Sequence, residues 1–150
     1  MLDAGGAGAM TLAHFHAVQA RVFALLTGDP ELMGLTGGHV RDGAAAGAPL
    51  PDVQVLIGPE RVRPFASATS DGATHEFTVE VIGARDGFDL PKRVAARVGD
   101  LLLAPAGIGD PDGAHLVRMQ FLRAEARRLT GPARRQIRLT FRAVVESDEN

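Results

Sequence analysis

The sequence predicts an α+β fold: a mainly antiparallel sheet of four to five strands with two main helices packed on one face. The clearest strand signal is Thr74–Ile82, THEFTVEVI, in which apolar and polar residues alternate with a period of two. Two other stretches place apolar residues at steps of three and four, the spacing of an amphipathic helix. Helices of this kind bury their apolar stripe against one face of a sheet.

The first helix is expected to begin at Thr11 as N-cap and to end at Gly28, where a residue without Cβ can adopt the left-handed conformation. Its apolar stripe consists of Leu12, Phe15, Val18, Val22, Leu25 and Leu26. Asp29–Pro30 then predicts a second, short helix, because a capping residue followed by proline is typical of a helix start. Gly37–Gly38 ends it.

The next strands are predicted at His39–Arg41 and Val53–Ile57. Between Val53–Ile57 and the Thr74–Ile82 strand, Pro59–Ala73 shows no periodicity and contains Pro, Ser, Asp and Gly. We interpret it as a long excursion between two strands. Loops of this length in a compact domain are usually functional or disordered, so this segment is a candidate contact arm.

The second half of the chain predicts a helix and two long strands. Asp89 is expected to cap the helix, with Leu90, Val94, Val98, Leu101 and Leu102 on one stripe. The strands are His115–Leu129 and Gln136–Val145, joined at Thr130–Pro132. In the first of them the apolar phase slips by one residue at Phe121–Leu122, which predicts a β-bulge.

Length and composition favour one domain. The 150 residues are divided into a flexible tail over residues 1–10, a single domain over 11–146 and a frayed end over 147–150. The chain has no cysteine, which excludes disulfides and thiol chemistry. Its formal charge of -2 argues against a polyanion binder. No apolar run approaches the roughly 18 residues of a membrane span.

No group of residues predicts catalysis. His14 and His16 are two apart and point to different faces of a helix, while His39, His75 and His115 are isolated. No nucleophile–base pair, phosphate loop or metal-ligand cluster can be named. We therefore expect no enzyme activity, no cofactor, no metal and no small-molecule substrate.

The strongest charge feature is a set of arginines in the last two strands. Between Arg118 and Arg142 there are eight arginines and one acidic residue, Glu125. Together with the Pro59–Ala73 segment they give the candidate interface residues Arg61, Arg63, Phe65, Arg118, Arg123, Arg127, Arg134, Arg138 and Arg142. The predicted bulge places the six named arginines of the last strands on one face of the sheet or at its tip.

Three interpretations of these arginines are open. They can contact acidic residues of a neighbouring subunit or tube, contact DNA, or form a solvated face with intramolecular pairs. Unbalanced like charge favours an interface over the solvated face. Among interfaces we favour protein, because a conduit that bound many phosphates would grip its DNA tightly.

Several segments together resemble the tail-completion, or tail-terminator, family of long-tailed phages and phage-like gene-transfer-agent particles. They are LLTGDPELMGLTGGHVRDG, PLPDVQVLIG and FDLPKRVAARVGDLL, within a similarity that covers Val18 to Val145. The most telling pieces are Asp29–Pro30, Gly38–Gly43 and the Leu50–Pro51 entry into a strand. Asp52 departs from the aromatic residue that such proteins often carry there.

The resemblance implies a structural protein that forms a ring, typically a hexamer, at the end of the tail tube. Such a ring stops tube polymerisation and offers a surface to the head–tail connector protein, while DNA only passes through its lumen. The expected location is the head-proximal end of a particle tail, after assembly in the bacterial cytoplasm. A connector subunit, a tail-tube subunit and a DNA-binding module remain alternatives, and the family supplies no catalytic residue.

Overall fold

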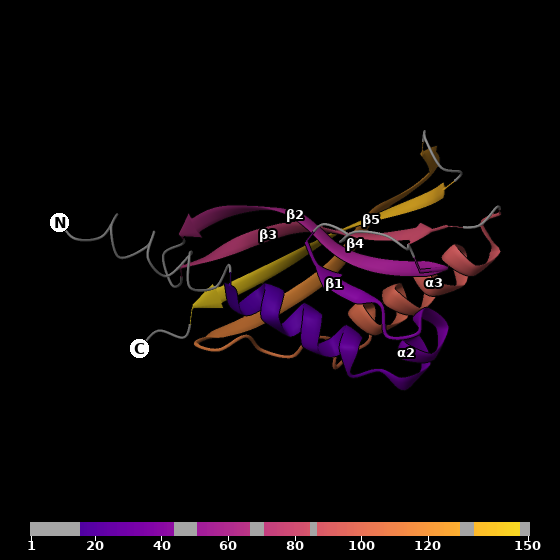
Figure 1. The fold of residues 1–150 in the computed structure, drawn as a ribbon. Helices are drawn as coiled ribbons and strands as arrows, with labels where there is room; N and C mark the ends of the chain where they lie inside the picture. The colour runs from indigo at the N-terminus through magenta and orange to yellow at the C-terminus, as the bar shows by residue number, and fades with distance from the viewer. Residues whose placement is uncertain (1–15, 44–50, 67–70, 85–86, 130–133, 148–150) are drawn as a thin grey trace.

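The computed structural model describes residues 16–43, 51–66, 71–84, 87–129 and 134–147. Figure 1 shows one twisted sheet with the helices gathered on one side of it. The predicted α+β class is confirmed. The predicted tail over residues 1–10, the expected cap Thr11 and the turn at Thr130–Pro132 lie outside the described residues. None of the described helices has the length and hydropathy needed to cross a membrane.

The sheet has five strands in the order β1-β2-β3-β5-β4. They are β1 (Val40–Asp42), β2 (Val53–Ala66), β3 (Asp71–Gly83), β4 (Ala114–Leu129) and β5 (Arg134–Ser147). The short β1 pairs with β2 in parallel, and every other pairing is antiparallel. The four long strands β2, β3, β5 and β4 therefore form the antiparallel part of the sheet, with β4 at its edge.

Three helical segments cover one face of this sheet (Figure 1). They are residues 16–27, α2 (Pro30–Thr36) and α3 (Asp89–Leu103). The periodic apolar residues of the first and last helices pack in one core with the inward residues of the strands. Residues at most 1% exposed in this core include Val22 and Val98 of the helices and Val79 and Phe141 of the strands. The stripes read from the sequence are thus the faces that hold the helices to the sheet.

The predicted boundaries of α2 are confirmed by its capping geometry. The Asp29 carboxylate accepts the N–H of Leu32 at 2.9 Å, and Pro30 occupies the first turn. Gly37 ends the helix in the left-handed conformation, with φ 63°. The start of α3 differs from the prediction: Phe88 is its N-cap, and Asp89 forms an ion pair with Arg93 at 3.5 Å one turn later.

The prediction that Pro59–Ala73 is a long loop between two strands is wrong, because most of this segment belongs to β2 and β3. After a register shift between Ile57 and Glu60, β2 continues to Ala66 and pairs with β3 from Asp71 onward. The shift exchanges the two faces of the strand, so Glu60 lies beside the buried His75, with 3.0 Å between its Oε2 and the ring Nδ1. A bulge and an inward glutamate hide the alternation that would otherwise mark a strand.

The bulge predicted at Phe121–Leu122 is confirmed by a register shift between Phe121 and Arg123. A second shift, between Leu116 and Arg118, was not predicted. Two bulges strengthen the twist of β4 and return its alternate residues to the same faces. Arg118 lies between the two bulges, so the second bulge alone puts it on the same side of the sheet as Arg123.

Candidate assembly interface

The face of the sheet opposite the helices holds all eight candidate arginines. The pairing between strands shows on which face each arginine lies. Arg138 and Arg142 occupy outward positions of β5. In β4, Arg118, Arg123 and Arg127 lie opposite other outward residues of β5. Outward positions also include Arg134 in β5 and Arg61 and Arg63 in β2. The predicted single face therefore extends over four strands.

Five of the candidate residues converge on one depression of this face, which we call the arginine hollow. Its volume is about 540 Å³, and its lining is Arg61, Arg63, Phe65, Thr74, Glu76, Arg118, Arg142 and Val144. Strand register explains the convergence, because Arg61, Glu76 and Arg142 occupy one cross-strand row and Arg63, Val144 and Arg118 the next. Four cations and one carboxylate thus share a small concave surface.

Within the described residues, the four arginines of the hollow form no hydrogen bond or ion pair with another residue. Two other arginines of the same face do form such contacts. Arg138 forms an ion pair with Glu80 at 3.1 Å, and Arg127 donates to the Gln136 side chain at 2.7 Å. Intramolecular pairing therefore accounts for Arg138 and Arg127 but leaves the hollow with uncompensated positive charge. Such a surface favours an anionic partner.

The other candidate arginines, Arg123 and Arg134, lie outside the hollow. Arg123 is exposed opposite Thr140, and Arg134 sits near the tip of the β4–β5 pair opposite Leu129. The candidate residues thus divide into a convergent group at one end of the face and a row that leads away from it.

Charge is segregated between this face and the rest of the chain. Counting Arg41 of β1, the outward positions hold nine of the 15 basic residues that the structure describes but four of the 14 described acidic ones, Glu76, Glu80, Glu125 and Glu146. Six basic and ten acidic residues of the described chain therefore lie elsewhere. A basic face and an acidic remainder make head-to-tail contact between copies electrostatically favourable.

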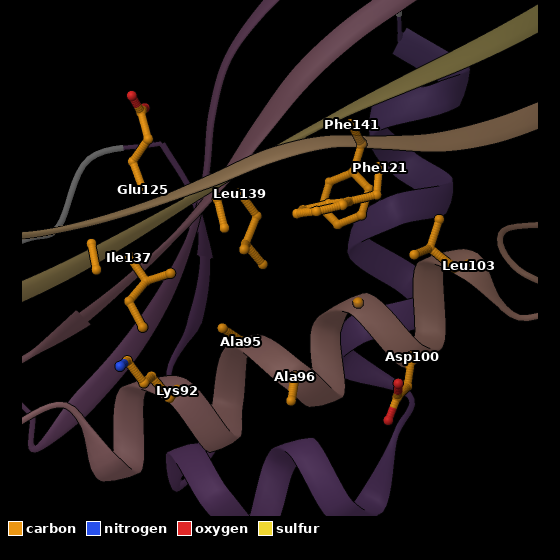
Figure 2. A pocket seen from close by; sticks show the side chains of 13 residues that line it. Lys92, Ala95, Ala96, Asp100, Leu103, Phe121, Glu125, Ile137, Leu139 and Phe141 are labelled. Atoms are coloured by element: carbon orange, nitrogen blue, oxygen red, sulfur yellow. The ribbon is translucent and has the colours of Figure 1, made fainter.

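The structure also contains an apolar groove that the sequence analysis did not identify, between α3 and the β4–β5 pair (Figure 2). We call it the α3–β4 groove, and its volume is about 420 Å³. Besides Lys92, Asp100 and Leu103, the helix lines it with three small residues, Ala95, Ala96 and Gly99, which leave space between α3 and β4. Phe121 and Leu103 line the groove and remain 47% and 46% exposed.

A sequence signal for this groove exists in retrospect. Small residues occupy the inward positions of β4 at Ala124 and Ala126, opposite Leu139 and Ile137 of β5. Small residues on the facing surfaces of a helix and a strand leave space between them. No local pattern, however, shows that α3 is the element facing β4.

Neither surface resembles a catalytic site. Among the described residues there is no group of three or more His, Asp and Glu side chains placed to hold a metal ion. The buried pair His75–Glu60 lies on the core side of the sheet, away from the arginine hollow. What the arrangement offers is charge and apolar surface for contact with another macromolecule.

Comparison with known proteins gives these surfaces a context. Residues 20–146 match the family described as tail completion protein gp17. The chain belongs to the tail completion protein family. It is also similar to a chain in a solved structure, the virion of a native gene transfer agent particle, with 39% identity and a TM-score of 0.78 over 88% of this chain and 96% of that one. No curated protein matches the chain.

Membership of this family confirms the resemblance that the sequence showed, and it makes the chain a structural subunit of a phage-type tail. The arginine hollow and the α3–β4 groove are therefore candidate contact surfaces of such a subunit.

Proposed function

We propose that this tail completion protein forms a ring, typically a hexamer, that caps the tail tube and ends its polymerisation. The ring then provides an attachment surface for the head–tail connector, and it occupies the head-proximal end of a phage or gene-transfer-agent tail. Family membership and the similarity to a chain of a gene transfer agent virion support this role.

The observation that favours a ring most is the unpaired arginine hollow on a helix-free face. Clustered like charges repel one another unless a partner compensates them. The acidic remainder of an identical subunit is such a partner, and so is an acidic rim on the tube. Contact between two different surfaces of the same protein closes into a ring when the rotation between subunits permits it.

Light scattering and electron microscopy of the purified protein test the proposal. We expect ring-shaped particles or caps on the ends of isolated tail tubes, and tubes that stop growing when the protein is added during assembly. A protein that stays monomeric and has no effect on tube growth would contradict the proposal. Tubes that incorporate the protein along their length would instead identify it as a tube subunit.

A further inference from the structure

The free edge of the sheet offers a second contact, separate from the arginine hollow. We propose that β4 receives an extended segment of a partner protein in which apolar residues alternate with acidic residues. The segment would pair with β4 as an added strand, with its apolar side chains in the α3–β4 groove and its acidic side chains beside the arginines. This inference rests on the proposed function and gives the chemistry of one partner in the tail.

The backbone of β4 is suited to strand addition. It is the longest strand, 16 residues, and within the described residues it pairs with β5 on one side and with no strand on the other. Residues 123–128 are exposed, whichever face they belong to. Edge strands carry unpaired N–H and C=O groups, and proteins usually shorten such edges or place proline in them. Strand β4 is long and has no proline.

The inward face of this edge is apolar and open. Ala124 and Ala126 point to the helix side of the sheet, and the groove beside them is bounded by Phe121 and by Leu103 of α3. In Figure 2 the side chains of Leu103 and Ala95 of α3 lie on the side of the helix that faces Phe121 and Leu139 of the strands. An added strand would place every second side chain here, so these positions require apolar residues.

The outward face of the same edge is basic. Arg123 and Arg127 alternate with Ala124 and Ala126, and Glu125 is the acidic residue between them. Arg123 forms no hydrogen bond or ion pair with another described residue. Opposite charges directly across a strand pair are favourable and like charges are unfavourable. The side chains of the added strand that face outward are therefore expected to be acidic.

A second copy of this chain fits the edge poorly. Its own open edges are β4 itself, the three-residue β1 and the part of β2 beyond β1. Two β4 strands paired antiparallel about Glu125 would set Arg123 against Arg127, and like charges directly opposite each other are unfavourable. That part of β2 carries Arg61 and Arg63 on the outward face, where they would meet Arg123 and Arg127. It also contains Pro59 and Pro64, which have no N–H to donate. The charges and the missing donors favour a different protein.

Fluorescence anisotropy with a labelled peptide of four Val-Glu repeats tests the inference, and a peptide of four Val-Lys repeats is the matched control. We expect the Val-Glu peptide to bind at least about tenfold more tightly than the Val-Lys peptide. Hydrogen exchange should show slower exchange of the amides of residues 121–128 in the complex. Arg123→Glu should weaken binding about tenfold, whereas Arg93→Glu, on exposed α3 surface outside the groove lining, should not.

Gly99→Leu tests the groove with little risk to folding. A Cβ at Gly99 would meet no atom within 4 Å, and leucine favours a helix more than glycine does. The added side chain should occupy the groove and weaken the binding of the Val-Glu peptide about tenfold. Equal binding of the two peptides, unchanged exchange in β4, or duplex DNA binding in place of the Val-Glu peptide would overturn the inference.

Light scattering of the same samples separates this inference from the proposed ring. A ring that forms but does not bind the Val-Glu peptide overturns the inference alone. A monomer that binds the peptide contradicts the ring alone. If Arg123→Glu and Gly99→Leu instead cause the ring to dissociate into monomers, β4 is a contact between copies of this chain. The proposal of a different partner protein is then wrong.

Discussion

Asp29 joins two helices through one carboxylate. It accepts the Leu32 N–H at the start of α2, and its two oxygens accept from Arg97 of α3 at 2.6 and 2.8 Å. Hydrogen bonding from Arg97 is the main cause that holds the pKa of Asp29 below its ordinary value, against the opposing effect of burial. The sequence predicted the cap, but the link to Arg97, 68 residues away, depends on the fold.

Replacing Asp29 with asparagine and with alanine separates these contacts. Asparagine can still cap the helix, whereas alanine cannot, so Asp29→Ala should lower the free energy of unfolding by about 1 kcal/mol more than Asp29→Asn. Urea unfolding of the two variants at neutral pH measures this difference. Equal stability of the two variants would show that the cap is unimportant.

The pH dependence of stability should also change in Asp29→Asn. Because the pKa of Asp29 is lower in the folded chain than in the unfolded chain, its carboxylate stabilises the fold above the unfolded value of about 3.9. That contribution is lost as the pH falls through the lower, folded value. The stability difference between the native chain and Asp29→Asn should therefore be largest near pH 7 and decrease below pH of about 4.

At the scale of elements, two glycines are expected to respond to alanine in opposite directions. Gly99 lies inside α3, and a Cβ there would meet no atom within 4 Å. Gly99→Ala should raise the free energy of unfolding by about 0.5–1 kcal/mol, since alanine loses less entropy in a helix. Thermal and urea unfolding check the change. A loss of stability would show that the groove side of α3 is more crowded than the structure indicates.

Gly72, in β3, has no such space. A Cβ there would overlap the Val145 carbonyl oxygen and lie 2.7 Å from the Phe65 ring. Since a backbone oxygen cannot move aside as a flexible side chain can, Gly72→Ala should lower the free energy of unfolding by about 1–3 kcal/mol. The same unfolding measurements test it, and an unchanged midpoint would contradict the tight register of β3 and β5.

Strand patterns were predicted well where one phase of alternation continued. The slip at Phe121–Leu122 was visible because the apolar phase changes there. The slip near Val117 was not, because Val117, Met119 and Phe121 already form a regular apolar alternation, although Val117 is in fact exposed. The continuation of β2 beyond Ile57 was missed because an inward glutamate is unusual in a strand. Glu60 is tolerated there because it contacts His75 on β3, and the local sequence does not show that contact.

The candidate surfaces were predictable to different degrees. That the arginines of β4 and β5 share a face follows from alternation plus one bulge. The strand order β2-β3-β5-β4 brings Arg61 and Arg63 close to Arg118 and Arg142, which are more than 50 positions away in the chain. The local sequence does not show this order. The α3–β4 groove depends on where a helix stops covering a sheet. No pattern within α3 or β4 contains that information.

At the scale of the whole molecule, the separation of charge implies that assembly depends on ionic strength. If the basic face of one subunit meets the acidic remainder of the next, salt weakens the contact, because the Debye length falls from about 10 Å at 0.1 M to about 3 Å at 1 M. The mass of the ring measured by light scattering should therefore fall toward that of a monomer between these concentrations.

Reversing one charge in the arginine hollow should mimic that effect. Arg142 lines the hollow and forms no ion pair or hydrogen bond with another described residue. Arg142→Glu should therefore shift the equilibrium toward monomer by about tenfold or more at 0.1 M salt, with little change in thermal stability. Arg93→Glu makes the same change of charge on exposed α3 surface and should leave the ring intact. Because both variants have the same net charge, a difference between them locates the contact on the sheet face. Rings that survive Arg142→Glu and 1 M salt alike would show that apolar surface, not this charge, holds the subunits together.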